Sequence, residues 1–490
     1  MSARDRTLSE PDPLDAPGAT GATVRGGAAR AAAWSAGAVL SLVSIPLLVR
    51  HLGLTRFGEY VTVLSLINIA ALASDLGIGA LALREWAARE PRDRAQVLAS
   101  LLGLRIAVAS LGALTALVFA VAADYPSAMV AGTAIAALGV FAQVFGDFAL
   151  VALAGSLRFG AVAAVELARS ALGTAGIVVL VLAGSGLVPF FAAYAVAALI
   201  AAVLAVALAR GQVSLVPRFG TGHWRPLLAD AAAYAAAAVV HVVYLRVVMV
   251  VVSLEASGRQ SGLFATAFHI FEFAAAVAAV LAATLMPLLA RAARDDRERL
   301  GRGAGAALRA GLLVGAFGAL ALGLGAPTVV DLIGGGTADA APVLRIEAAA
   351  IATAFASFAL GAVLLVLRRY RALLVVNVSG LVVALGAALV LVPDHGARGA
   401  AVAAVIGEAV IAIGQLTAVA RDLPIGSQLA RALAAIVPAA AAAVGVFALL
   451  PLPNALATVA ALATFVGVVA LLRGVPPELR LLAFPARNVG

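Results

Sequence analysis

The chain has 490 residues, of which 63% are hydrophobic and only 12% are charged, and its mean hydropathy is +1.08. Soluble domains carry about 25% charged residues because they need a hydrated surface. This composition therefore excludes a soluble enzyme, a nucleic-acid-binding protein and a disordered chain. We predict an all-α polytopic membrane protein.

The basic residues are all arginine, and the 34 of them exceed the 25 acidic residues by nine. Abundant Ala, Gly, Val and Arg without Lys indicate GC-rich coding and a bacterial source. There is no cysteine, which excludes disulfides, iron–sulfur clusters and cysteine-ligated zinc. The arginines occur in short gaps between apolar stretches, so we expect them to orient the chain in a membrane.

In chain order, residues 1–29 are polar and aperiodic and are predicted to form a disordered tail without a signal peptide. A membrane-spanning helix needs about 20 mostly apolar residues. Fourteen stretches meet this requirement. Their limits are 31–49, 60–83, 96–123, 128–155, 161–183, 187–209, 228–253, 263–290, 306–330, 346–367, 372–392, 399–420, 432–450 and 454–472.

An even number of spans places both termini on the same side of the membrane. If that side is the cytoplasm, 26 arginines fall in cytoplasmic segments, five in external loops and three within spans. Such an asymmetry in short loops follows the positive-inside rule. We therefore predict a multi-pass protein of the bacterial plasma membrane with both termini in the cytoplasm.

Weak internal repeats divide the chain into two similar halves. Gly58-Glu-Tyr is repeated as Gly262-Leu-Phe after 204 residues, and the same offset relates Leu104-Arg105 to Leu308-Arg309. Two six-helix lobes in parallel repeat, with a cavity between them, are typical of transporters. The predicted regions are a cytoplasmic tail (1–29), an N-terminal lobe (30–210), a cytoplasmic linker (211–226), a C-terminal lobe (227–421) and an accessory helix pair with a short cytoplasmic tail (422–490).

Ionisable residues within spans are candidate functional residues, because each costs a few kcal/mol to insert. Arg246 lies near mid-membrane, four or more residues from any acid, and we expect it to face the cavity. Arg105 could instead reach the headgroups at the cytoplasmic end, and Glu166 with Arg169 could form an internal ion pair. The other candidates for polar or counter-charge roles are Asp75, Asp147, His241, Tyr244, His269 and Glu272.

His269 and Glu272 are three residues apart, and so lie on one face of a helix. Two ligands without a third make a poor metal site, so we expect a hydrogen-bonded pair rather than bound metal, and no cofactor. No Walker A sequence is present, and no external loop is long enough for a catalytic subdomain. We therefore expect a protein that is not an enzyme.

The segment RHLGLTRFGEY from Arg50, followed by Asp75-Leu76-Gly77-Ile78, resembles the first hairpin of polysaccharide-repeat-unit (Wzx-type) flippases. These belong to the multidrug/oligosaccharidyl-lipid/polysaccharide exporter (MOP) superfamily. Residues 244–272 and 326–345 are also similar to family segments. Many relatives have an acid directly after the arginine of the seventh span, whereas this chain has Val247.

The resemblance implies that the chain moves a polyprenyl-diphosphate-linked oligosaccharide from the cytoplasmic to the outer leaflet. It implies diphosphate contacts by Arg246, with Arg105 and Arg169 as further candidates. The expected partners are the lipid-linked oligosaccharide, membrane lipids and, in the same pathway, a glycan polymerase and glycosyltransferases. We expect a monomer that binds no nucleic acid.

Four alternatives within and beyond this family remain open at the level of sequence. An ion-coupled exporter of cationic drugs would favour an acid-lined cavity, and a peptidoglycan-precursor flippase would share the same plan. A major-facilitator transporter would carry a Gly-containing loop between the second and third spans, whereas this loop reads REWAAREPRDR. A membrane-embedded assembly partner without transport activity would also fit the composition.

Overall fold

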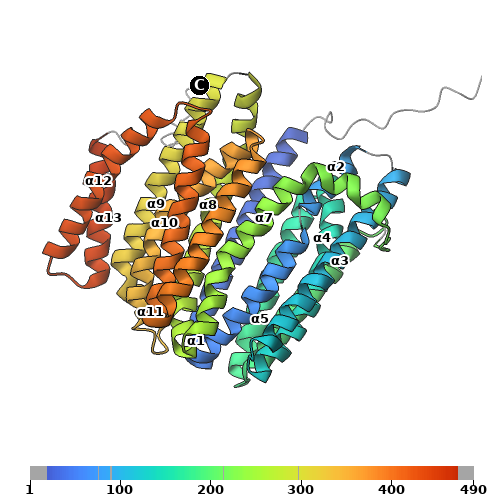
Figure 1. The fold of residues 1–490 in the computed structure, drawn as a ribbon, viewed down its shortest axis with the longest axis horizontal. Helices are drawn as coiled ribbons and strands as arrows, with labels where there is room; N and C mark the ends of the chain where they lie inside the picture. The colour runs from blue at the N-terminus through green and yellow to red at the C-terminus, as the bar shows by residue number, and fades with distance from the viewer. Residues whose placement is uncertain (1–18, 76, 89–90, 213–214, 296, 473–490) are drawn as a thin grey trace, which may run out of the picture.

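The structure, a computed structural model, describes residues 19–75, 77–88, 91–212, 215–295 and 297–472. Within these ranges every regular element is an α-helix (Figure 1). The helices are α1 (Ala19–Asp75), α2 (Ile78–Ala88), α3 (Pro91–Ala122), α4 (Ser127–Gly155), α5 (Phe159–Leu182), α6 (Leu187–Leu208), α7 (Thr221–Glu255), α8 (Gly258–Asp295), α9 (Arg297–Ile333), α10 (Ala340–Val366), α11 (Tyr370–Ala420), α12 (Gly426–Leu449) and α13 (Asn454–Leu471).

Twelve helices of the described chain are long and apolar enough to cross a membrane. Two of these, α1 and α11, each consist of two helical halves joined at a sharp turn. Gly53 (φ 74°) interrupts α1 and Gly396 (φ 54°) interrupts α11. Each half of these helices exceeds the roughly 20 residues that a crossing requires, so the prediction of about fourteen spans is confirmed. The turns are tighter than predicted, because one glycine in the left-handed region replaces each expected loop.

Among the boundaries that differ from the prediction, three change the assignment of a segment. The second span ends at Asp75 rather than near residue 83, because Gly77 (φ 72°) breaks the helix and a short helix, α2, follows. Helix α1 begins at Ala19, within the stretch predicted as a disordered tail, and α7 begins at Thr221, within the predicted linker. The remainder of that tail, residues 1–18, lies outside the described residues.

Helices α1–α6 pack chiefly against one another and form what we call the N-lobe. Helices α7–α11 form the C-lobe, and α1 packs against α7 and α8 between the two lobes (Figure 1). The accessory pair, α12 and α13, contacts α9 at the edge of the C-lobe. The start of α1 and the end of α13 lie at the same end of the bundle (Figure 1), as an even number of crossings requires.

Small residues allow the helices to approach closely, as is usual where lipid provides no hydrophobic driving force between helices. The most extensive helix contact in the C-lobe is that of α9 with α10. A Cβ added to Gly311 would lie 2.8 Å from the carbonyl oxygen of Phe355, and one added to Gly315 would lie 3.0 Å from Ala352 Cα. Backbone contact at this spacing fixes the relative position of the two helices.

The two lobes are joined by hydrogen bonds only at the end of the bundle where Gly53 lies, within the described part of the chain. Arg50 donates from Nε to the Ile333 carbonyl (2.7 Å) and from Nη2 to the Leu332 carbonyl (2.8 Å). The hydroxyls of Tyr125 and Ser253 share a hydrogen bond of 2.6 Å. This end, which we call the Gly53 end, is therefore closed by direct contact between the lobes.

Candidate functional site

A cavity of about 450 Å³ lies between the two lobes. Both halves of α1, together with α5 and α6, form its N-lobe wall, and α7 and α8 form its C-lobe wall. Four of the ten predicted site residues line it: Arg169, Arg246, His269 and Glu272. The expectation that Arg246 faces an inter-lobe cavity agrees with this placement.

Arg246 meets an acid from the neighbouring helix rather than from its own. Its guanidinium forms an ion pair with Glu272 on α8 and lies over the ring of Phe268, 5.5 Å from the ring centre. The other oxygen of the Glu272 carboxylate is 2.9 Å from Nδ1 of His269, so the predicted His269–Glu272 contact is present. Arg246 is 15% exposed and Glu272 24%, which leaves both accessible from the cavity.

Arg169 enters the cavity from the N-lobe wall, opposite Arg246. No carboxylate of a described residue forms an ion pair with it. The surrounding wall carries hydroxyl and amide groups and aromatic rings, which the sequence interpretation did not single out. These residues are Ser41, Ser44, Asn68, Ser170, Thr174, Tyr60, Tyr194, Phe57 and Phe190.

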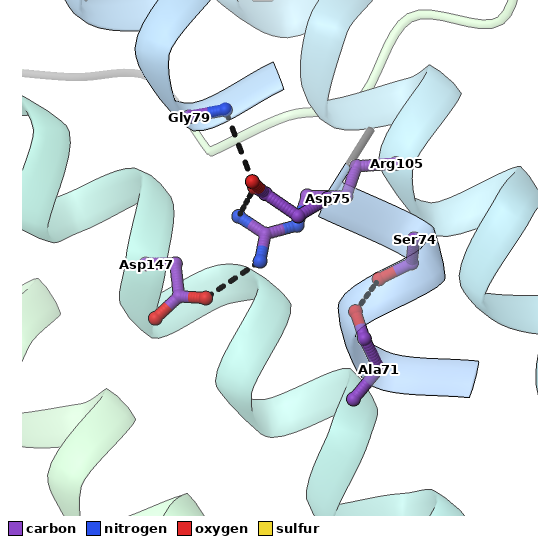
Figure 2. Close-up of polar contacts among 6 residues, drawn as sticks. All are labelled: Ala71, Ser74, Asp75, Gly79, Arg105 and Asp147. Carbon is purple, nitrogen blue, oxygen red and sulfur yellow. Dashed lines mark hydrogen bonds and ion pairs between the residues drawn. The ribbon is translucent and has the colours of Figure 1, made fainter. Parts of the chain in front are cut away.

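Arg105 lies inside the N-lobe between two carboxylates, as Figure 2 shows. Its Nη2 is 2.6 Å from Asp147 Oδ2, and its Nη1 is 3.4 Å from Asp75 Oδ1. Asp75 also accepts a hydrogen bond of 3.2 Å from the Gly79 N–H, at the start of α2. The Arg105 side chain is only 6% exposed, so it neither reaches the headgroups nor lines the inter-lobe cavity in this conformation.

The remaining predicted residues lie away from the main cavity. Asp147 and Glu166 line a small space of about 20 Å³ between α4, α5 and α6, which Arg169 also borders. Tyr244 points into the C-lobe, where its hydroxyl donates to Glu408 Oε1 at 3.0 Å. The expected Glu166–Arg169 ion pair is not among the described contacts, although Glu166 has a partner.

His241 lines a second cavity of about 260 Å³ that lies wholly within the C-lobe. Asn377 and Gln415 are buried beside it, and neither side-chain carbonyl oxygen has a hydrogen-bond partner in the described structure. The described residues contain no group of three or more His, Cys, Asp or Glu that could hold a metal ion. Glu347, fully buried near Tyr244, was not among the predicted site residues, although it lies at the start of the predicted tenth span.

Residues 23–293, more than half of the chain, match the family described as polysaccharide biosynthesis protein. No curated protein sequence matches the chain. Among solved structures, the fold is similar to the lipid II flippase MurJ in an inward closed conformation. The TM-score is 0.71 at 11% identity, over 93% of this chain and 99% of that one.

The fold is also similar to an inward-facing multidrug resistance MATE family transporter of the MOP superfamily (TM-score 0.61, 17% identity, 80% of this chain and 98% of that one). A MOP superfamily transporter from Pyrococcus furiosus gives a TM-score of 0.60 at 17% identity, over 82% of this chain and 95% of that one. The likeness at these identities concerns the fold. The family match shows that the chain belongs to the polysaccharide biosynthesis protein family, and the bundle of apolar helices shows a multi-pass membrane protein with the fold shared by these flippase and transporter structures.

Proposed function

We propose that the protein is a flippase that moves a polyprenyl-diphosphate-linked oligosaccharide from the cytoplasmic to the outer leaflet. The observation that carries this proposal is the cavity between the lobes, with an arginine on each wall. Alternating access by movement of the N-lobe against the C-lobe would expose this cavity to each side in turn. The lobes would act as the two units predicted at residues 30–210 and 227–421.

A diphosphate cannot cross hydrocarbon unaided, since a bare ion there costs tens of kcal/mol. The guanidinium of arginine binds phosphate oxygens through two parallel hydrogen bonds. Arg169 and Arg246 would therefore replace water around the diphosphate while it crosses. Arg105, enclosed by Asp75 and Asp147, supports the N-lobe from within and is not in a position to touch the cavity's contents.

The N-lobe wall suits a sugar chain. Serine, threonine and asparagine side chains there offer hydrogen bonds to sugar hydroxyls, and the rings of Tyr60, Tyr194 and Phe190 offer apolar faces. A cavity of about 450 Å³ accommodates the diphosphate and the first sugars, with the rest of the glycan outside it. The prenyl chain would remain in the bilayer.

The proposed orientation of the chain in the membrane follows from the arginine distribution. The end of the bundle where α1 starts and α13 ends (Figure 1) is the arginine-rich end, which the positive-inside rule would assign to the cytoplasm. The Gly53 end, where the lobes touch, would then be external, and the cavity would be closed on that side. We propose the bacterial plasma membrane as the location, with a polymerase and glycosyltransferases acting before and after transport.

A peptidoglycan-precursor flippase is the second candidate. The alignment with the lipid II flippase covers 93% of this chain, whereas the alignments with the MATE transporters cover 80–84%. Both candidates share a polyprenyl-diphosphate head, so the arginine chemistry is the same. They are distinguished by whether loss of the protein stops growth outright or only removes a surface glycan.

A cation exporter is less well supported by the cavity. Glu272 is the only acid that lines it in the described structure, and this acid is already paired with Arg246. A cationic drug would have to displace an arginine from its counter-ion and pass a second arginine, Arg169. The cavity's charge therefore favours an anion.

The test is transport of a fluorescent polyprenyl-diphosphate oligosaccharide in proteoliposomes. We expect Arg246→Gln and Arg169→Gln each to lower the initial rate at least tenfold with normal membrane insertion. Arg259→Gln is the matched control, because Arg259 is also paired with a carboxylate, Asp339, but at the surface. Unchanged transport in both cavity variants, or uptake of cationic dyes by the wild type instead, would refute the proposal.

A further inference from the structure

Arg169 borders two separate spaces, one between the lobes and one inside the N-lobe. On one side it borders the main cavity, and on the other it borders the small space that Asp147 and Glu166 also line. It is therefore the one residue that the described structure places in both. A side chain with five N–H donors can serve groups on both sides or shift between them.

Asp147 is held in a fixed position by the interior of the N-lobe. It is paired with Arg105 at 2.6 Å, and Arg105 is itself held by Asp75 from the other side (Figure 2). Two carboxylates thus share one guanidinium, which leaves one negative charge of this trio without a cation. The guanidinium carbon of Arg105 also lies over the ring of Phe148, 6.0 Å from the ring centre.

Besides Arg105, the arginine that shares the small space with Asp147 is Arg169. It interacts electrostatically with Asp147, as does Arg105. Tyr194 lies close enough to interact with Arg169 and with Arg246 on the opposite wall. The carboxylate of Asp147 therefore acts on a cation that also faces the substrate path, in a region where charges are screened less than in water.

We propose that Asp147 is a positioning residue for anion binding, which draws Arg169 toward the N-lobe interior and so competes with the substrate for its guanidinium. The proposal rests on the function proposed above. Such competition lowers the affinity of the cavity for the anion, so that the anion can dissociate after it has crossed. By linkage, the anion must weaken the Arg169–Asp147 interaction to the same extent as Asp147 weakens the anion's binding.

The first test measures the affinity of the purified full-length protein for farnesyl diphosphate. We expect Asp147→Asn to bind the probe about fivefold more tightly than the wild type, in the usual range of coupling between sites. Arg169→Gln should bind it more weakly, and Asp147→Asn should add no gain in that background. A merely structural role for Asp147 would lower affinity, not raise it.

Asp75→Asn is the matched control. It removes the same charge from the same trio, but from the far side of Arg105. Its gain in affinity should be clearly smaller than that of Asp147→Asn. An equal gain, a loss of affinity in Asp147→Asn, or a gain that persists without Arg169 would overturn the proposal.

A second measurement does not depend on the lipid substrate. The chain has no cysteine, so Ser41→Cys places a single thiol on the cavity wall. Its reaction with an anionic methanethiosulfonate should be about fivefold faster in Asp147→Asn, and this acceleration should vanish with Arg169→Gln. No acceleration, or one that survives the loss of Arg169, overturns the inference even if the lipid binds. If the thiol reaction is accelerated as expected but farnesyl diphosphate does not bind, the result would contradict the proposed substrate and leave the role of Asp147 intact.

Discussion

Gly58 and Gly262, which occupy equivalent positions in the two halves of the internal repeat, meet backbone to backbone where the lobes touch. A Cβ added to Gly58 would lie 2.7 Å from the Gly262 amide nitrogen, and one added to Gly262 would lie 2.0 Å from the Leu54 carbonyl oxygen. Two residues related by the repeat can meet only near the axis that relates the lobes. Glycine at both positions therefore permits the close contact that shuts the Gly53 end.

We predict that Gly58→Ala opens this end. The methyl group cannot fit against backbone atoms at 2.7 Å, so the lobes must separate to accept it. A single cysteine at Ser41 should then react at least threefold faster with a membrane-impermeant thiol reagent applied from outside intact cells. The matched control is Gly386→Ala, since a Cβ at Gly386 meets nothing within 4 Å. Equal labelling in the two variants would show that this glycine pair does not hold the gate.

This pair illustrates which parts of the fold the sequence could predict. The repeat offset located Gly58 and Gly262 as equivalent, and apolar length located the spans, because both properties depend on residues close in sequence. The breaks around Gly53 and Gly396 were predicted from the polar residues on either side of each glycine, but as loops. That a single glycine makes each turn was not predictable, since the sequence does not show which residue adopts a positive φ. The break after Asp75 depended on the conformation of Gly77, which its neighbours do not reveal.

The Arg246–Glu272 pair gives the second prediction. Glu272→Gln removes the counter-charge and leaves Arg246 free for phosphate, so diphosphate affinity should rise while turnover falls. Arg246→Gln should lower both affinity and turnover. Each single variant should also lower the melting temperature, because one partner of a partly buried pair is left behind.

The double variant Arg246→Gln/Glu272→Gln separates stability from function. It should recover most of the lost melting temperature, since neither charge then lacks a partner, but it should not recover transport. Unfolding followed by tryptophan fluorescence in detergent gives the first quantity, and proteoliposome flux gives the second. Recovery of transport would show that Arg246 acts only through its pairing with Glu272.

Sequence reasoning selected Arg246 and Arg169 because a charge in a span demands an explanation, and both line the cavity. The sequence did not reveal which residues contact these arginines. The acid that neutralises Arg246 lies on another helix, 26 positions along the chain, and Arg105 meets Asp147 only through the packing of α3 on α4. Uncharged lining residues such as Asn68 and Tyr194 carry no signal in sequence, because serine, asparagine and tyrosine occur in spans without function.

Glu347 gives the third prediction. It is fully buried in the C-lobe among Phe264, Phe268 and Phe271, and neither carboxylate oxygen has a hydrogen-bond partner in the described structure. A buried polar group without a partner costs about 1–3 kcal/mol. Glu347→Leu should therefore raise the melting temperature.

Glu408→Leu is the contrasting variant, because it removes the acceptor of the Tyr244 hydroxyl and should lower the melting temperature. Increased stability with lost transport in Glu347→Leu would show that the chain keeps this acid for its transport cycle. A lower melting temperature in Glu347→Leu would mean that the carboxyl contributes to folding, contrary to the geometry.

The last prediction concerns the segment that joins the lobes. Its Arg218 N–H donates to the carbonyl of Ala99 on α3 (2.9 Å), and a Cβ added to Gly103 would lie 2.2 Å from the Arg218 carbonyl oxygen. Gly103→Ala should therefore detach the segment and speed trypsin cleavage after Arg218 about tenfold, as expected for a locally opened backbone. Gly220→Ala, whose Cβ meets nothing within 4 Å, should leave cleavage unchanged. This attachment fixes where the joining segment leaves the N-lobe for α7. Gly103→Ala should therefore also slow transport while leaving diphosphate affinity intact, and an equal loss of affinity would show that it acts on the cavity instead.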